Sequence, residues 1–156
     1  MSETLCLPET LCPPARYDQP EPGMFEAIYR ALSASSQDLI GPAAPQVLAI
    51  PLRDDAGRVT GGFWGCTLFR WLSVQMLFVP TALRGQGVGA ALMASAEAEA
   101  RRRGCFGAQV DAFSFQAAPF YEKLGYTRFG VLADCPPGYD RLYYSKRLDL
   151  PFAGVA

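Results

Sequence analysis

The chain has 156 residues, half of them hydrophobic, and its 14 Lys and Arg against 15 Asp and Glu leave a formal charge of −1. This length favours one domain with a sizeable core, and the balanced charge argues against a nucleic-acid-binding protein, which usually carries a basic excess. Histidine is absent, which excludes the Ser-His-Asp triad, the Cys-His dyad and His-ligated zinc. The sequence shows neither a membrane-spanning apolar run nor a signal peptide. It therefore predicts a soluble, cytoplasmic protein with no membrane or nucleic-acid partner.

The first residues differ from the rest of the chain. A near-duplicate, ETLCLP followed by ETLCPP, occupies positions 3–14, and its prolines exclude a central strand. We interpret residues 1–14 as a flexible or edge-packed extension and residues 15–156 as a single domain, beginning with a short strand near 15–18. The five cysteines form no CxxC pair and are interpreted as reduced structural residues. A metal site at Cys6 and Cys12 would lack further ligands.

Hydrophobic periodicity and turn residues predict alternating helices and strands. The strand at 71–79 is mostly apolar, as in strands buried on both faces, and the strand at 106–112 should run parallel to it because a long helix joins the two. Residues 33–45 are expected to be a polar connection. The chain is therefore predicted to be a mixed α/β domain with an antiparallel front half and a parallel crossover in the middle. Helices are expected at 24–33, 87–103 and 119–125, and strands at 47–52, 59–69, 71–79, 106–112, 127–132 and 141–148.

A glycine-rich stretch, VPTALRGQGVGA at 79–90, lies between the third of these strands and the long helix. Glycines at alternating positions let the backbone turn tightly and direct several N–H groups outward, in front of the positive end of the helix. The pattern favours phosphate or pyrophosphate binding over a glycine-rich helix start without a ligand. It is neither a P-loop nor the dinucleotide fingerprint, because no Gly-Lys-Ser/Thr follows and the spacing is GxGxG rather than GxGxxG.

Two motifs resemble those of the GNAT N-acetyltransferase superfamily. RGQGVG at 84–89 resembles the family's Gln/Arg-x-x-Gly-x-Gly/Ala motif, and FYEKLGY at 120–126 resembles its second landmark, FYEKLGF. The motifs stand in the family's order and separation, and the similarity covers roughly residues 47–148. Residues 111–116 and the PPG at 136–138 further resemble a small bacterial branch of the family. The resemblance implies the GNAT acyl-CoA N-acyltransferase fold, in which a central parallel strand pair splays around the cofactor, and acetyl-CoA as the acetyl donor.

The same resemblance implies roles for individual residues. Backbone N–H groups from Arg84 to Gly89 would hold the pyrophosphate, and the pantetheine arm would bond to the backbone of Phe78 and Val79. The N–H of Val79 would stabilise the thioester oxygen, and Tyr121 would protonate the departing thiolate unless it is only an amphipathic tyrosine lining the cleft. The catalytic residues implied are Tyr121 and Val79, and the cofactor-binding residues are Phe78, Val79, Arg84, Gly85, Gln86, Gly87, Val88, Gly89, Ala90 and Ser114.

The sequence also departs from the family pattern. Ser114 stands where many members carry Asn, and the third strand reads SVQM at 73–76, without the frequent carboxylate. Gln75 can orient a water molecule but cannot accept the proton, so a water chain, Asp111 or the free-base fraction of the substrate must remove it. The arginines at 101–103 could reach the 3′-phosphate of CoA, but the favoured interpretation is that they complement the helix C-terminus.

These features predict an acetyltransferase that moves acetyl from acetyl-CoA to a primary amine of a small molecule or peptide. Direct attack in a ternary complex is expected, because no residue resembles an activated covalent nucleophile. The alternative is a non-catalytic CoA-binding or interaction module of the same fold. An unrelated nucleotide-binding α/β protein remains if the loop binds ATP. Acceptor specificity is expected in residues 33–45 and 134–140. No metal is expected, and a homodimer is left open.

Overall fold

The computed structural model describes residues 19–41, 44–116 and 118–149, so the expected strand at 15–18 and the boundary at residue 15 lie outside the described part. The chain divides into two units, residues 1–42 and 43–156. The first contains the helix α1 (Met24–Ile40). The prediction that this helix ends at Ser33 is wrong, because no proline or glycine interrupts the chain before Gly41. There φ reaches 74° and the N–H of Gly41 bonds to the carbonyl of Gln37 at 2.9 Å.

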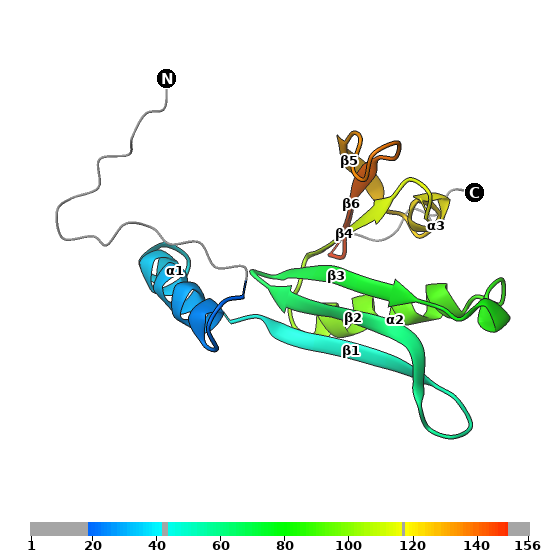
Figure 1. The fold of residues 1–156 in the computed structure, drawn as a ribbon, viewed down its shortest axis with the longest axis horizontal. Coiled ribbons are helices and arrows are strands. Elements are labelled where there is room, and N and C mark those ends of the chain that lie inside the picture. The colour runs from blue at the N-terminus through cyan, green and yellow to red at the C-terminus, as the bar shows by residue number, and fades with distance from the viewer. Residues whose placement is uncertain (1–18, 42–43, 117, 150–156) are drawn as a thin grey trace. The chain divides into compact units, whose positions relative to one another are not determined.

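The second unit contains a six-stranded mixed sheet in the order β1-β2-β3-β4-β6-β5 (Figure 1). Only β3 and β4 pair in parallel, and the other neighbours are antiparallel. The observed bounds match the predicted strands to within one residue, which confirms the antiparallel front half and the parallel crossover. The strands are β1 (Gln46–Arg53), β2 (Val59–Leu68), β3 (Trp71–Phe78), β4 (Gly107–Phe113), β5 (Thr127–Leu132) and β6 (Arg141–Arg147).

The crossover from β3 to β4 is made by a short 3₁₀ turn, η1 (Thr81–Leu83), and the helix α2 (Val88–Arg102). This helix packs on β1, β2 and β3, and the fully buried Ala96 and Ala100 on its inner face allow a close approach to the sheet. Arg103 caps the helix and Gly104 follows with φ 79°, which is the left-handed conformation that commonly ends helices. The remaining helix, α3 (Ala118–Lys123), contacts β5.

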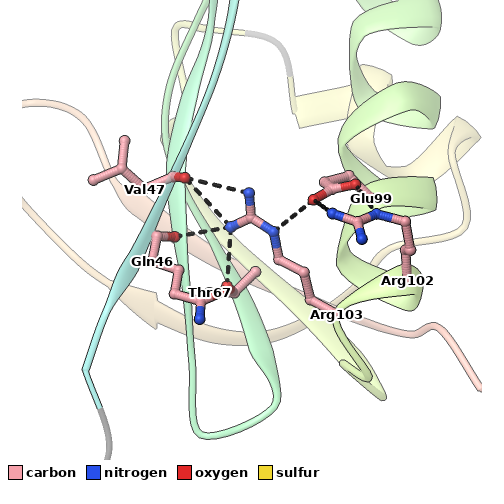
Figure 2. Close-up of polar contacts among 6 residues, drawn as sticks. All are labelled: Gln46, Val47, Thr67, Glu99, Arg102 and Arg103. Atoms are coloured by element: carbon pink, nitrogen blue, oxygen red, sulfur yellow. Dashed lines mark hydrogen bonds and ion pairs between the residues drawn. The ribbon is translucent and has the colours of Figure 1, made fainter.

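Arg103, at the end of α2, connects this helix to the sheet, whereas Arg102 contacts Glu99 of its own helix (Figure 2). The guanidinium of Arg103 donates hydrogen bonds to the carbonyl of Val47 at 3.3 Å and to the hydroxyl of Thr67 at 3.2 Å. Its Nε lies 2.7 Å from Glu99, as does the Nε of Arg102. Hydrogen bonds from Arg102 and Arg103 lower the pKa of Glu99 to about 2. These contacts support the interpretation of the arginine cluster as part of the helix end rather than as a phosphate contact.

A buried carboxylate, Glu97, lies between α2 and β6. It is only 4% exposed, and its oxygens lie 2.8 and 3.0 Å from the Nζ of Lys146. The hydroxyl of Tyr126 donates to it at 3.1 Å, and Arg101 approaches to 3.6 Å. Burial, followed by the charge of Glu97, raises the pKa of Tyr126. Because an isolated charge is costly to bury, these partners are what allow Glu97 to stay in the core.

Replacing Lys146 by methionine is expected to lower the free energy of unfolding by about 3–5 kcal/mol, because the variant leaves the carboxylate of Glu97 without its main counter-charge. The matched control is Arg58→Met, which removes an exposed ion pair with Asp54 and should cost far less. Urea denaturation of both variants measures the difference. Equal, small losses would show that the pair contributes no more than a surface one.

Candidate active site

A cleft opens where β3 and β4 separate. The two strands pair only as far as Val74 with Val110, and beyond that point they diverge (Figure 1). On its other side, β3 has an irregularity in its ladder with β2 beside Gly65, which is a place where strands bend. The cleft has a volume of about 1210 Å³. Its geometry leaves the second half of β3 without a β4 partner.

The prediction that this strand is buried on both faces is wrong for that second half. Gln75, Met76 and Phe78 are exposed, and all three line the cleft. The strand loses its neighbour at the split, so side chains that a continuous sheet would cover instead face the opening. The apolar run that suggested burial therefore forms a cleft wall.

The loop between β3 and α2 presents a run of unused backbone donors. Gly85 and Gly87 have φ values of 72° and 79°, which glycine adopts at low cost. Within the described residues, the N–H groups of residues 85–90 donate no hydrogen bond, and Gly87, the N-cap of α2, provides no side-chain cap. These donors lie at the positive end of the helix dipole, an arrangement that binds anions.

The structure places most of the expected cofactor-binding residues along this cleft, with two exceptions. The side chain of Gln86 donates to the carbonyl of Ala82 at 2.8 Å, and the hydroxyl of Ser114 accepts from the N–H of Asp140 at 3.0 Å. Neither Gln86 nor Ser114 lines the cleft. The expected residues that do line it are Phe78, Val79, Arg84, Gly85, Gly87, Val88, Gly89, Ala90 and Tyr121.

Arg84 reaches back along the cleft rather than toward the helix end. Its Nε donates to the carbonyl of Val79 at 3.0 Å, and its guanidinium lies 5.9 Å from the centre of the Phe78 ring. The side chain of Arg84 therefore holds the end of β3, along which the pantetheine arm is expected to lie. In this arrangement the anion-binding capacity of the loop comes from the backbone.

Tyr121 lies in α3 within a cluster of aromatic rings. Its ring centre is 5.1 Å from that of Phe120 and 5.9 Å from those of Tyr126 and Tyr144, and its residue surface is only 6% exposed. Burial, assisted by the charge of Asp111, raises the pKa of Tyr121 to about 12. The phenol is therefore protonated at neutral pH, and it borders the cleft. Its hydroxyl has no hydrogen-bond partner within the described part of the chain.

A cleft residue that the sequence reasoning missed is Arg141. It lies opposite Phe113 in the β4–β6 ladder, and its Nε contacts Oδ2 of Asp111 at 2.7 Å. Both charged residues line the cleft, together with Phe113 and Phe115. The pairing of β6 with β4 is what brings Arg141 there, and no motif near residue 141 indicates that pairing.

The structure describes three cysteines. Cys66, Cys105 and Cys135 are free, and burial raises the pKa of the Cys105 thiol, which disfavours the reactive thiolate. Within residues 19–41, 44–116 and 118–149, no three Cys, Asp or Glu side chains gather as metal ligands. None of the helices in these ranges has the length and apolarity needed to cross a membrane.

Comparisons with known proteins agree on the family to which this fold belongs. A family model described as an acetyltransferase (GNAT) domain matches residues 50–128. The chain is 42% identical to the acetyltransferase Atu2258 of Agrobacterium fabrum over 122 residues, 78% of this chain and 89% of that protein. It is 39% identical to the blasticidin-S acetyltransferase of Streptomyces morookaense over 110 residues, 69% of this chain and 81% of that one.

A solved structure extends this similarity to the fold. The crystal structure of an acetyltransferase from Agrobacterium tumefaciens superposes with a TM-score of 0.79 at 39% identity, covering 85% of this chain and 97% of that chain. The chain belongs to the GNAT acetyltransferase family. Enzymes of this family use acetyl-CoA as the acetyl donor.

The residues of the cleft fit this donor. The unused N–H groups of residues 85–90 suit a pyrophosphate, and the largely apolar wall formed by β3 suits the pantetheine arm. A Cβ at Gly85 or Gly87 would meet no atom within 4 Å, so an anion can approach the backbone there. The donor's own contribution is an activated acetyl thioester.

Proposed function

We propose that this protein is an N-acetyltransferase that moves acetyl from acetyl-CoA to a primary amine of a small molecule, by direct attack in a ternary complex. The observation that carries the proposal is one cleft that holds both the unused N–H groups of residues 85–90 and the protonated phenol of Tyr121. The first suits the pyrophosphate and the second suits the leaving thiolate. The acceptor class is supported by the relative whose name is blasticidin-S acetyltransferase.

The reaction forms a C–N bond and breaks a C–S bond. The amine attacks as its neutral form and afterwards loses one proton to water, while the sulfur gains one. The N–H of Val79 would donate to the carbonyl oxygen as negative charge develops there. Tyr121 would donate its hydroxyl proton to the sulfur and be reprotonated from solvent. Because its pKa of about 12 exceeds that of a thiol, about 8.5, the transfer is uphill even to the full thiolate, so it would accompany C–S cleavage and be completed by reprotonation of the phenolate from solvent.

A second candidate is a CoA-binding module without catalysis. The observation in its favour is that β3 carries Ser73 and Gln75 at its split and no carboxylate. Thiol release from acetyl-CoA with a panel of primary amines distinguishes the two. Turnover with at least one amine supports the enzyme, and absence of turnover across the panel, with acetyl-CoA still bound, supports the module.

Acetyl-CoA is expected to raise the melting temperature of the protein by several degrees at concentrations about 100 times its Kd, because a ligand of the folded state stabilises it by mass action. ATP and NAD should have little effect at the same concentrations, since neither carries a pantetheine arm. Differential scanning fluorimetry with the three ligands provides the measurement. An equal shift with ATP would contradict the assignment of the cleft to CoA.

The pH profile of kcat/KM is expected to rise about tenfold per unit as the acceptor deprotonates, then to stay level without a fall below about pH 11. The phenol of Tyr121 acts in its protonated form, and its pKa of about 12 keeps that form present. Initial-rate assays with an acceptor amine of pKa near 8 make the pH-independent part of the kcat/KM profile measurable. A fall centred near pH 10 would contradict this role.

The folded state must be checked at each pH by circular dichroism. A phenol whose pKa is higher in the folded than in the unfolded chain contributes stability below about pH 10, and this contribution is lost as the pH rises toward 12. If the circular dichroism signal and the rate fell together, the loss of rate would therefore reflect unfolding and not the titration of Tyr121 during catalysis.

A further inference from the structure

The cleft extends past Tyr121 to side chains outside the stretch of residues that is expected to bind the donor. They come from β4, from the turn after it and from β6, so this wall faces the second half of β3 across the split. It combines one carboxylate, one guanidinium and two aromatic rings, from Asp111, Arg141, Phe113 and Phe115.

Asp111 stands at the split itself, because it follows Val110, the last β4 residue paired with β3. Its Oδ2 contacts Arg141 at 2.7 Å, and Oδ1 has no hydrogen-bond partner within the described residues. The effect of its charge on the pKa of Tyr121 shows that the two groups are within electrostatic reach. A carboxylate oxygen is therefore available in the same cleft as the proposed proton donor.

Arg141 fixes the direction in which this carboxylate points. Its guanidinium lies 5.7 Å from the ring centre of Phe113 and 5.8 Å from that of Tyr143, so the side chain is held between two aromatic rings and the Asp111 ion pair. Bound in this way, Arg141 orients Asp111 and leaves Oδ1 as the open acceptor.

The aromatic rings of the wall contact one another and Tyr139. The rings of Phe113 and Phe115 are stacked, 5.3 Å apart with 10° between their planes, and Tyr139 meets Phe115 edge-on at 4.8 Å. Phe115 nevertheless remains 54% exposed. A large, flat, fixed apolar surface at the edge of a cleft is suited to stacking with another flat ring.

We propose that this wall is the acceptor subsite, and that it selects a primary amine carrying a planar unsaturated ring a short chain away from the nitrogen. The inference rests on the proposed acetyl transfer. The acceptor binds as an ammonium ion beside Asp111, and its ring stacks on Phe115. After one proton passes to water, the neutral amine keeps an N–H bond to Oδ1, which directs its lone pair toward the thioester.

The test compares two acceptors, 2-phenylethylamine and 2-cyclohexylethylamine, which share their chain and differ in the flatness of the ring. We expect wild-type kcat/KM to favour the phenyl compound by about 3- to 10-fold, the range of aromatic pair energies. Phe115→Leu should remove this preference. Phe129→Leu, which changes an exposed ring outside the cleft lining, should retain it.

Asp111→Asn should lower kcat/KM for both amines by about 10- to 100-fold, the value of a hydrogen bond to a charged group. The Kd for acetyl-CoA should change less than about twofold, which a merely structural role would not predict. Asp55→Asn, in the exposed β1–β2 turn, is the control. Melting temperatures of all variants identify any that unfold.

Three outcomes would overturn the subsite: no phenyl preference in the wild type, a preference that survives in Phe115→Leu, or full activity in Asp111→Asn. Faster transfer to butylamine than to 2-phenylethylamine would also overturn it. These results leave acetyl transfer itself intact. Binding of acetyl-CoA without thiol release for any amine would instead refute the proposed function.

Discussion

Replacing Gly89 by valine is expected to weaken acetyl-CoA binding by at least about 100-fold, a loss of about 2.7 kcal/mol, while the protein remains folded. Gly89 is the second residue of α2, and its backbone conformation is open to other residues. A Cβ there would lie 3.3 Å from the Phe120 ring and 3.6 Å from Cγ2 of Val79. Valine methyl groups would therefore occupy the space between the loop amides and α3, which the pyrophosphate is expected to enter.

The matched control is Ala98→Val, which introduces the same β-branched side chain at an exposed position of the same helix. The helix-propensity change is below about 1 kcal/mol in both variants, a small gain for Gly89→Val and a small loss for Ala98→Val, but only Gly89→Val lies beside the cleft. Isothermal titration with acetyl-CoA and thermal melts separate binding from stability. If the affinity of Gly89→Val stays within about twofold of the wild type, the phosphate site lies elsewhere.

The sheet could be predicted because local signals there agree with the fold. Apolar runs and turn residues placed each strand of the observed sheet, and the long helix required β3 and β4 to be parallel. The same signals failed where one sequence pattern is compatible with two different structures. The apolar run at β3 is typical of a strand covered on both faces, but it is equally compatible with a strand that lines a cleft where two strands diverge. Polar residues after Ser33 suggested a connection, yet without proline or glycine they continue α1 to Ile40.

The candidate site was only half predictable for a related reason. The proposed donor side lies within one continuous stretch of sequence, residues 78–90, and its glycines form a pattern that sequence reasoning can recognise. The acceptor wall instead joins Asp111 and Phe115 to Arg141 through strand pairing. That pairing is a long-range property, and the composition around residue 141 does not encode it. Asp111 could be named from sequence as one of several proton acceptors, and Phe113 and Phe115 among the aromatic residues of which one or two could line an acceptor cleft, but Arg141 could not.

Replacing Tyr121 by phenylalanine is expected to lower kcat by about 10²–10⁴-fold, the usual contribution of a positioned general acid. The change removes one oxygen and keeps the ring, so the contacts with Phe120, Tyr126 and Tyr144 persist. Affinity for acetyl-CoA should change less than about twofold. A loss in kcat with KM nearly unchanged marks an interaction that forms only in the transition state.

A neighbouring tyrosine supplies the control. Tyr126→Phe removes a hydroxyl that donates to the buried Glu97 at 3.1 Å, in a ring whose centre is 5.9 Å from that of Tyr121. This variant should lose about 1–3 kcal/mol of stability, because a buried acceptor loses a partner, and should keep its kcat. Initial rates and urea denaturation of both variants therefore give opposite patterns if Tyr121 is the proton donor. Full activity in Tyr121→Phe would assign protonation of the thiolate to solvent and leave Tyr121 as a lining residue of the cleft.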